Sequence, residues 1–216
     1  MKKFELTTEF ITNMFGKKLF RIKALVEFGN VKVGELGGYV EKEGNVSQDG
    51  NAWVSGDARV SGNAWVSGDA RVCGDARVYG NAWVSGDAKV YGDARVYGDA
   101  RVYGDARVCG NAWVSGNAWV SGDARVCGDA RVYGNARVSG DADYALAQGF
   151  GTEFRCTTFY RDKNKKIIVN CGCFHGNLEA FRKQVVETRS GKIAKEYLMI
   201  ADLMEYHFAS EDSDDE

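Results

Sequence analysis

The sequence predicts a mainly β protein: a single-stranded β-solenoid with an 18-residue coil, an N-terminal β cap and a small C-terminal ββαα cap. The first observation behind this is a glycine every six residues from Gly50 to Gly140, sixteen in all without a slip. The second is that each hexad places Ala and Val two positions apart. In an extended backbone these two side chains share one face, and the Trp, Arg or Lys between them points to the other face.

Each hexad is expected to form one short strand and one corner. The Gly-Asp and Gly-Asn pairs favour turns, because glycine accepts a positive φ and Asx side chains bond to nearby backbone. A hexad cannot bury its Ala-Val face alone, so the strands must wrap around a common axis. Three flats are the fewest that enclose a core, which gives the 18-residue coil. Cys73, Cys109 and Cys127 are spaced by two such coils and then by one, so they would share one column.

The chain divides into four segments by pattern. They are a cap leading into the solenoid (1–49), the repeats (50–143), a second cap (144–208) and an acidic tail expected to be disordered (209–216). Counting the leader, about six coils are expected. The two caps would cover strand edges that otherwise invite end-to-end growth.

The C-terminal cap is expected to contain a hairpin followed by two helices. The stretch EFRCTTFYRDKNKKIIVNCGCFHGN predicts the hairpin, with residues 161–166 at its tip. Asn177 is placed to cap a first helix, and a second is expected to follow Gly191.

The composition points to no particular partner. The chain carries 28 basic and 30 acidic residues, so it has no bulk affinity for polyanions. It contains no apolar stretch long enough to cross a membrane as a helix, and we expect a cytoplasmic protein without membrane contact. Its six scattered cysteines are expected to be reduced thiols.

The motif V-x-G-[DN]-A-x over residues 50–143 resembles the hexapeptide-repeat proteins that form left-handed parallel β-helices. That resemblance implies the left hand of the coil. The leader LFRIKALVEFGNVKVGELGGYVEKEGNVSQDGNAWV is similar to leaders of phage and prophage hexapeptide-repeat proteins, whose roles are mostly unassigned. It implies a phage-encoded protein, with inhibition of a host defence factor as one role to consider.

Three outward walls follow from the 18-residue period. The first wall carries Trp65, Trp83, Arg101, Trp119 and Arg137. The second wall carries Arg59, Arg77, Arg95, Trp113 and Arg131, beside Tyr79, Tyr97 and Tyr133. The third wall carries Trp53, Arg71, Lys89, Arg107 and Arg125. Because Asp begins nearly every Arg hexad, we expect local charge balance between the two. Stacked Trp and Arg side chains are expected to form cation–π contacts.

The candidate binding residues are those of the first and second walls, because Trp, Tyr and Arg are enriched at binding hot spots. The leading hypothesis is a non-enzymatic binding or scaffold protein that presents these walls to a protein partner and needs no cofactor. Self-assembly along a wall, as a dimer or trimer, stays open. A further alternative is single-stranded nucleic acid or a phosphate ligand, with bases on Trp and phosphates near Arg. The Asp beside nearly every Arg argues against nucleic acid.

An enzymatic alternative, a divergent hexapeptide-repeat acyltransferase, has weak support in the residues. The resembling acyltransferases use a catalytic histidine, whereas His175 and His207 both lie beyond the repeats. Uninterrupted, near-identical hexads supply only copies of the same groups, so no catalytic residue is assigned.

The second cap contains residues that could form a metal site, but a packing role is the favoured interpretation. Cys156, Cys171, Cys173 and His175 could be read as four zinc ligands. Cys171, Cys173 and His175 equally continue the apolar face of Ile167 and Val169 on one strand, as a buried core row does.

Overall fold

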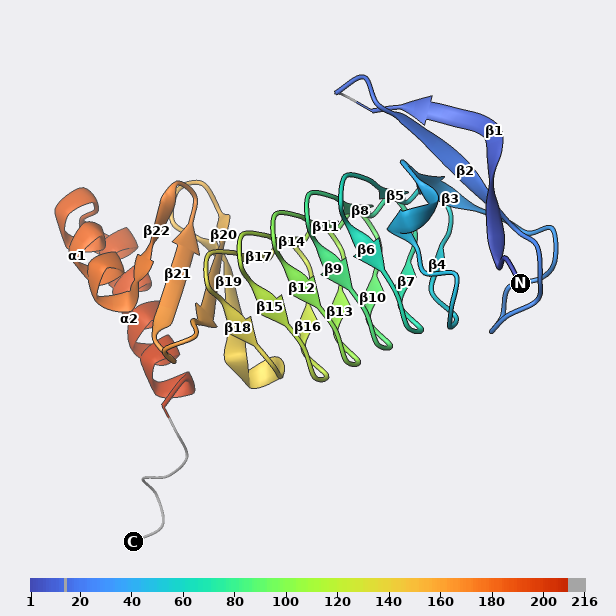
Figure 1. Cartoon of the computed structure of the whole chain (residues 1–216). Helices are drawn as coiled ribbons and strands as arrows, with labels where there is room; N and C mark the ends of the chain where they lie inside the picture. The colour runs from blue at the N-terminus through green and yellow to red at the C-terminus, as the bar shows by residue number, and fades with distance from the viewer. Residues whose placement is uncertain (14, 210–216) are drawn as a thin grey trace, which may run out of the picture.

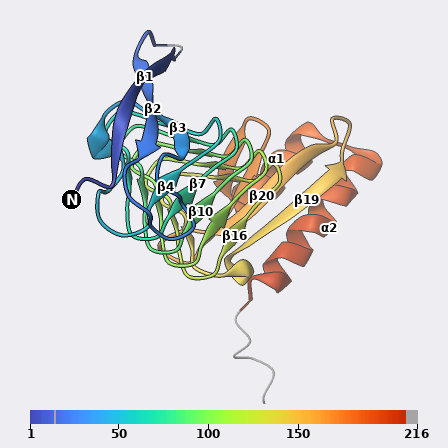
Figure 2. The same cartoon turned by 90° about the vertical axis from the view of Figure 1, so that its right-hand side faces the viewer.

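The computed structural model describes residues 1–13 and 15–209. A β-solenoid occupies the middle of the molecule, with an N-terminal hairpin at one end and a sheet backed by two helices at the other (Figure 1). Viewed from the N-terminal end, the coils superpose on one another and the hairpin extends beyond their outline (Figure 2). The predicted fold class is confirmed.

The repeats form fifteen two-residue strands in three parallel sheets, which makes five coils. One sheet contains β5 (Arg59–Val60), β8 (Arg77–Val78), β11 (Arg95–Val96), β14 (Trp113–Val114) and β17 (Arg131–Val132). The next contains β4 (Trp53–Val54), β7 (Arg71–Val72), β10 (Lys89–Val90), β13 (Arg107–Val108) and β16 (Arg125–Val126). The third contains β6 (Trp65–Val66), β9 (Trp83–Val84), β12 (Arg101–Val102), β15 (Trp119–Val120) and β18 (Arg137–Val138).

The core of the solenoid is made of the small apolar side chains that the pattern pointed inward. Every Ala from Ala52 to Ala136 and every Val from Val54 to Val138 in the hexads is at most 1 % exposed. In each sheet valine lies over valine, as Val84 pairs with Val102. Burial of one valine side chain contributes about 1.5 kcal/mol or more, so the repeated row supplies the main driving force for coiling.

The corners depend on glycine for two separate reasons. Gly86 has a φ of 67°, in the left-handed region that L side chains avoid. A Cβ added there would also lie 2.9 Å from the backbone nitrogen of Gly104 in the next coil. Successive coils therefore approach too closely at the corners for any side chain, and the strands between them form the ladder bonds, such as Trp83 N to the Ala100 carbonyl at 2.9 Å.

The N-terminal cap is a hairpin whose third strand enters the solenoid. β1 (Phe4–Thr12) and β2 (Lys18–Ala24) are antiparallel, and β3 (Leu36–Val40) then pairs in parallel with β5. Val40 pairs with Val60, slightly further along the chain than the 18-residue period would place its partner, and the 3₁₀ turn η1 (Glu43–Asn45) follows β3. The leader thus adds a sixth, slightly longer coil.

Two buried groups fasten this cap to the first repeats. The Lys3 ammonium donates to the carbonyls of Gly50 and Ala52 at 3.2 and 3.0 Å, and its burial lowers the pKa of Lys3 to about 8. Trp53 packs edge-on against Phe4 and Phe28 and is only 4 % exposed. Trp53 takes its predicted column on the third wall, where it pairs with Arg71, but it is not exposed as expected because the cap covers it.

The C-terminal cap contains the expected hairpin and helices together with two further strands. Its sheet runs β19 (Tyr144–Phe150), β20 (Arg155–Arg161), β21 (Ile167–Cys171) and β22 (Phe174–Asn177), all antiparallel. Helices α1 (Leu178–Thr188) and α2 (Gly191–His207) follow. Asn177 caps α1 as predicted, since its Oδ1 accepts from the Ala180 N–H at 2.8 Å.

This sheet separates the solenoid from the helices. Phe159 and Val169 pack against the helices, while Tyr160 belongs to the solenoid core on the other face. The Tyr160 hydroxyl donates to the Tyr133 carbonyl at 2.9 Å, and its burial raises the pKa of Tyr160 to about 12. Asn170 Nδ2 donates to the Arg131 carbonyl at 2.7 Å. These bonds cover the last coil, whose edge would otherwise be unpaired.

The cysteine column was predicted correctly, but its redox state was not. Cys109 and Cys127 lie on adjacent coils with Cα atoms 4.5 Å apart and form a disulfide, whereas Cys73 has a free thiol. In the part of the chain that the structure describes, no helix is long and apolar enough to cross a membrane. Beyond Ala209, the acidic tail lies outside the described residues.

Replacing a crowded corner glycine should destabilise the protein more than replacing an uncrowded one. Gly86→Ala combines the left-handed backbone with the 2.9 Å contact, and we expect it to lower the free energy of unfolding by about 2–4 kcal/mol. Gly128→Ala has nearly the same φ, 68°, but its nearest atom is 3.9 Å away, so about 1–2 kcal/mol is expected. Urea unfolding followed by circular dichroism measures both; equal losses would show that crowding between coils is unimportant.

Candidate functional site

The first wall is assembled as the 18-residue period predicted. Parallel pairing places Trp65 on Trp83, Trp83 on Arg101, and Arg101 on Trp119. Trp65 and Trp83 meet in an edge-to-face contact with centroids 6.0 Å apart, and their exposed fractions are 43 % and 45 %. Two large aromatic rings thus stand side by side on a rigid parallel sheet with nearly half of their surface in solvent.

The arginines of this wall lie over the tryptophan rings. The Arg101 guanidinium is 5.6 Å from the Trp83 ring and 5.2 Å from the Trp119 ring, and Arg137 is 4.1 Å from Trp119. Arg137 also donates to the carbonyls of Asn117 and Ala136 at 3.0 and 2.8 Å. The cation–π contacts predicted from the sequence are confirmed, and each contributes about 0.5–1 kcal/mol at an exposed position.

The second wall stacks in the same way. Trp113 is held between Arg95 and Arg131, whose guanidinium groups lie 4.9 and 5.2 Å from its ring. Beside the arginines, the Tyr79 and Tyr97 rings are parallel with centroids 4.9 Å apart. Every residue predicted for this wall therefore takes its predicted column, with Arg59 and Arg77 paired below Arg95.

The local charge balance expected between Asp and Arg does not take the form of direct ion pairs. Arg125 aside, no described Arg or Lys of the repeats lies within 4.0 Å of a carboxylate oxygen in a described ion pair. Four arginines of the first two walls lie over tryptophan rings of neighbouring coils instead: Arg95, Arg101, Arg131 and Arg137. The repeat aspartates lie in separate columns at the corners.

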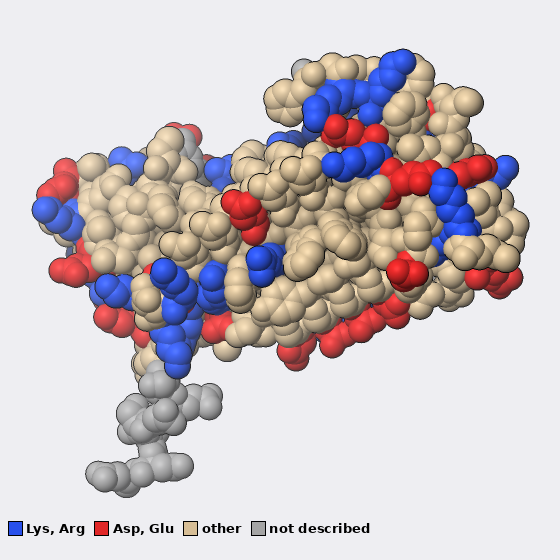
Figure 3. Space-filling view, viewed as in Figure 1, with Lys and Arg blue, Asp and Glu red and all other residues tan. Residues whose placement is uncertain are grey.

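The three columns of corner residues differ in their content of Asp and Asn, and therefore in charge. The corner before the third wall carries Asp69, Asp87, Asp105 and Asp123. The corner before the first wall carries Asn63, Asn81, Asp99, Asn117 and Asn135. Figure 3 shows acidic side chains in a row along the lower edge of the solenoid, next to a largely uncharged face. Amides therefore predominate at the corner before the first wall, while the carboxylate corner lies on its other side, between the first and third walls.

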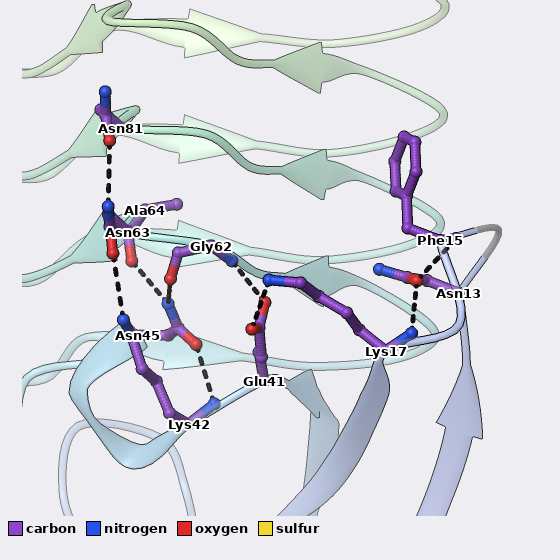
Figure 4. Close-up of polar contacts among 10 residues, drawn as sticks. All are labelled: Asn13, Phe15, Lys17, Glu41, Lys42, Asn45, Gly62, Asn63, Ala64 and Asn81. Carbon is purple, nitrogen blue, oxygen red and sulfur yellow. Dashed lines mark hydrogen bonds and ion pairs between the residues drawn. The ribbon is translucent and has the colours of Figure 1, made fainter.

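The amide corner is an organised ladder of hydrogen bonds. Lys42 Nζ donates to Asn63 Oδ1 at 3.2 Å, and Asn63 Nδ2 donates to Asn81 Oδ1 at 3.3 Å (Figure 4). Asn81 Nδ2 then donates to Asp99 Oδ1 at 3.0 Å. An amide both donates and accepts, so it can bridge the coil above and the coil below; two stacked carboxylates cannot.

The candidate zinc residues do not share the single strand face that was predicted for them. The strand turns at Gly172, between β21 and β22, so Cys171 and His175 belong to different strands. Thr157 pairs with Cys171, which places Cys156 on the opposite face of the sheet. His175 donates from Nδ1 to Asn170 Oδ1 at 2.6 Å and packs on the Tyr133 ring.

Within the described residues, no group of three or more His, Cys, Asp or Glu side chains is arranged to hold a metal ion. Burial raises the pKa of the Cys156 thiol, which favours its neutral form. Thr157 Oγ1 donates to Cys171 Sγ at 3.2 Å, and Cys171 packs beside Phe174 in the helix-facing core. These cysteines are thus parts of the cap's packing.

Comparison with known proteins supports the architecture. A family model described as the YdcK beta solenoid repeat matches residues 52–68, 70–86, 88–104, 100–116, 106–122 and 130–142. Most of these matches are close to one 18-residue coil in length, in agreement with the observed strand pairing. No curated protein matches the chain. The match and the coiled strands together support a repeat β-helix family.

Removing one charge from the acidic corner should stabilise the protein. In Asp87→Asn the carboxylate between Asp69 and Asp105 becomes an amide, so we expect a gain of about 0.5 kcal/mol that shrinks as salt is added. The matched control, Asn81→Asp, inserts a charge into the amide ladder and should lose a similar amount. Urea midpoints at low and high salt measure both, and a destabilised Asp87→Asn would contradict charge repulsion in this column.

Proposed function

We propose that this repeat β-helix is a non-enzymatic scaffold that presents its first wall to a protein partner. The observation that carries the proposal is the exposed pair Trp65 and Trp83, which neither cap covers. Aromatic and arginine side chains at the centre of an interface account for most binding hot spots, and a polar rim surrounds them. The first wall offers the rings and Arg101, with a corner of mostly amides on one side and a corner of carboxylates on the other.

Rigidity also favours a binding role. Trp83, Arg101 and Trp119 each lie between two neighbouring strands, and the Trp65 and Trp83 rings already contact one another. Such a surface loses little conformational entropy when a partner binds, which raises affinity for a given contact area. The flatness of a parallel sheet suits an equally flat or extended protein segment.

A catalytic role has less support from the arrangement of groups. Catalysis needs a few unlike side chains in one place, and the walls repeat the same few types along each column. His175 is hydrogen-bonded to Asn170 and packed on Tyr133, while His207 ends α2 against Phe208. The proposal is therefore a binding protein that acts without turnover.

The test is capture of a partner by the tagged full chain from a bacterial lysate, the source suggested by the phage-like leader. Trp83→Ala removes the centre of the exposed pair and should weaken the captured partner's binding by about 30-fold or more, the effect of a hot-spot residue. Tyr91→Ala is the matched control, because Tyr91 is an exposed aromatic residue beside the third wall. Binding of the purified partner by calorimetry measures both variants, and circular dichroism checks that they fold.

The mass of the protein in solution distinguishes self-assembly along the first wall from binding of a different protein. If the first wall joins copies of this chain, light scattering should report a dimer or trimer that Trp83→Ala converts to a monomer. A monomeric protein whose partner binds Trp83→Ala and Tyr91→Ala equally well would overturn the proposal.

A further inference from the structure

The N-terminal hairpin overhangs the second wall and forms an open-sided cavity of about 310 Å³ with it. Its lining comes from Thr12, Asn13, Phe15 and Leu19 of the hairpin and from Arg59, Ser61, Arg77, Tyr79 and Arg95 of the solenoid. The cavity lies apart from the first wall, and the inference drawn from it is independent of the proposed function.

Three arginines form one side of the cavity. Arg59, Arg77 and Arg95 are paired in register on successive coils, about 4.8 Å apart. None of the three guanidinium groups has a hydrogen bond or an ion pair with a described residue, although that of Arg95 lies 4.9 Å from the Trp113 ring. Like charges at this spacing repel, so a multivalent anion placed among them would be attracted strongly.

Among the described residues, no carboxylate lines this cavity, whereas carboxylates line other hollows on the solenoid. The groove along the third wall is lined by Arg71, Lys89 and Arg107, but Asp69, Asp87 and Asp105 lie in it as well. The aspartates of the second wall's own hexads, Asp57, Asp75 and Asp93, are not among the lining residues of the hairpin cavity. The hairpin thus encloses only the basic side of the second wall.

Two aromatic rings, those of Phe15 and Tyr79, also line the cavity. Tyr79 is stacked on Tyr97 with an angle of 1° between the ring planes. Phe15 is 77 % exposed, and Figure 4 shows its ring projecting from the end of the hairpin alongside the solenoid coils. A planar group in the cavity therefore has ring faces to stack on, next to three guanidinium groups.

The hairpin is held in this position by polar contacts. Lys17 Nζ pairs with Glu41 Oε1 at 2.8 Å, and Glu41 Oε2 accepts from the Gly62 N–H at 2.7 Å (Figure 4). Both contacts lower the pKa of Glu41, with the Lys17 bond contributing most. Asn13 Oδ1 accepts from the N–H groups of Phe15 and Lys17 and shapes the turn. The cavity is thus formed before a ligand enters.

We propose that this cavity binds a nucleotide, either free or as a unit of a single strand, with its phosphates at the arginine row and its base on Phe15 and Tyr79. Guanidinium groups bind phosphate oxygens bidentately, and stacking on aromatic rings accepts any base. The three guanidinium groups have no carboxylate partners in the described part of the chain. A ligand with several phosphates therefore suits the row better than a ligand with one carboxylate.

Calorimetry of the full chain with ATP and, separately, with a short oligothymidylate tests the site. We expect binding that weakens steeply as salt is added. Arg77→Gln should weaken it about 10-fold or more, since a charge-assisted contact is lost, and Phe15→Ala about 5-fold or more, since a stacking face is lost. Arg107→Gln on the third wall is the matched control and should bind as the wild type does.

A further variant tests the role of the hairpin without removing a ligand contact. Glu41→Gln breaks the pair with Lys17 and should weaken binding while Arg77 and Phe15 stay in place. Binding of ATP alone identifies a free nucleotide as the ligand, and tighter binding of the oligothymidylate identifies a strand. Failure of both ligands to bind, or an equal loss in Arg77→Gln and Arg107→Gln with intact circular dichroism, would overturn the proposal.

Discussion

The close approach of one corner to the next governs the rest of this structure. At the repeat corners from Gly50 to Gly122 the backbone of one coil contacts the backbone of the next, and a Cβ on Gly86 would lie 2.9 Å from Gly104 N. This contact enforces the 18-residue coil, because any slip would bring side chains into the crowded corner. The fixed register then places valine on valine inside and every outward residue on its counterpart outside. Columns of like residues are therefore an unavoidable result of the corner geometry.

Columns of like residues differ in their effect on stability, and the chain stabilises them in several ways. Asn63 and Asn81 bond along their column, and Arg101 between Trp83 and Trp119 converts a column of rings into mutual cation–π contacts. The aspartates before the third wall have no such compensation from an amide between them. The self-bonded amide corner borders the Trp-rich wall on one side, and the aspartate corner borders it on the other. A partner proposed for this wall would therefore meet a polar rim around the rings.

The sequence predicted the solenoid well because, within the repeats, the period alone decides each residue's environment. It failed where segments distant in sequence meet. Trp53 and Trp65 lie in identical GNAWVS hexads, yet Trp53 is buried because Phe4 and Phe28 pack over it. The period placed Cys109 above Cys127, but adjacency alone does not decide whether two thiols are oxidised. The order of Asn and Asp along the sequence indicates the difference between the corner columns. The sequence does not indicate the hairpin cavity, because that cavity depends on how the cap folds back.

This contrast explains where distinct sites arise in a repeat protein. Arg59, Arg77, Arg95 and Arg131 occupy one column and are chemically equal in sequence. Only the first three line the cavity under the hairpin, because the hairpin lies over them and Phe15 joins them. Repeated walls offer the same groups at every coil, which suits an extended protein surface. A compact ligand needs unlike groups at one point, and those occur where the non-repetitive cap meets the repeats. The two surfaces thus call for partners of different size, and each can be altered without changing the other.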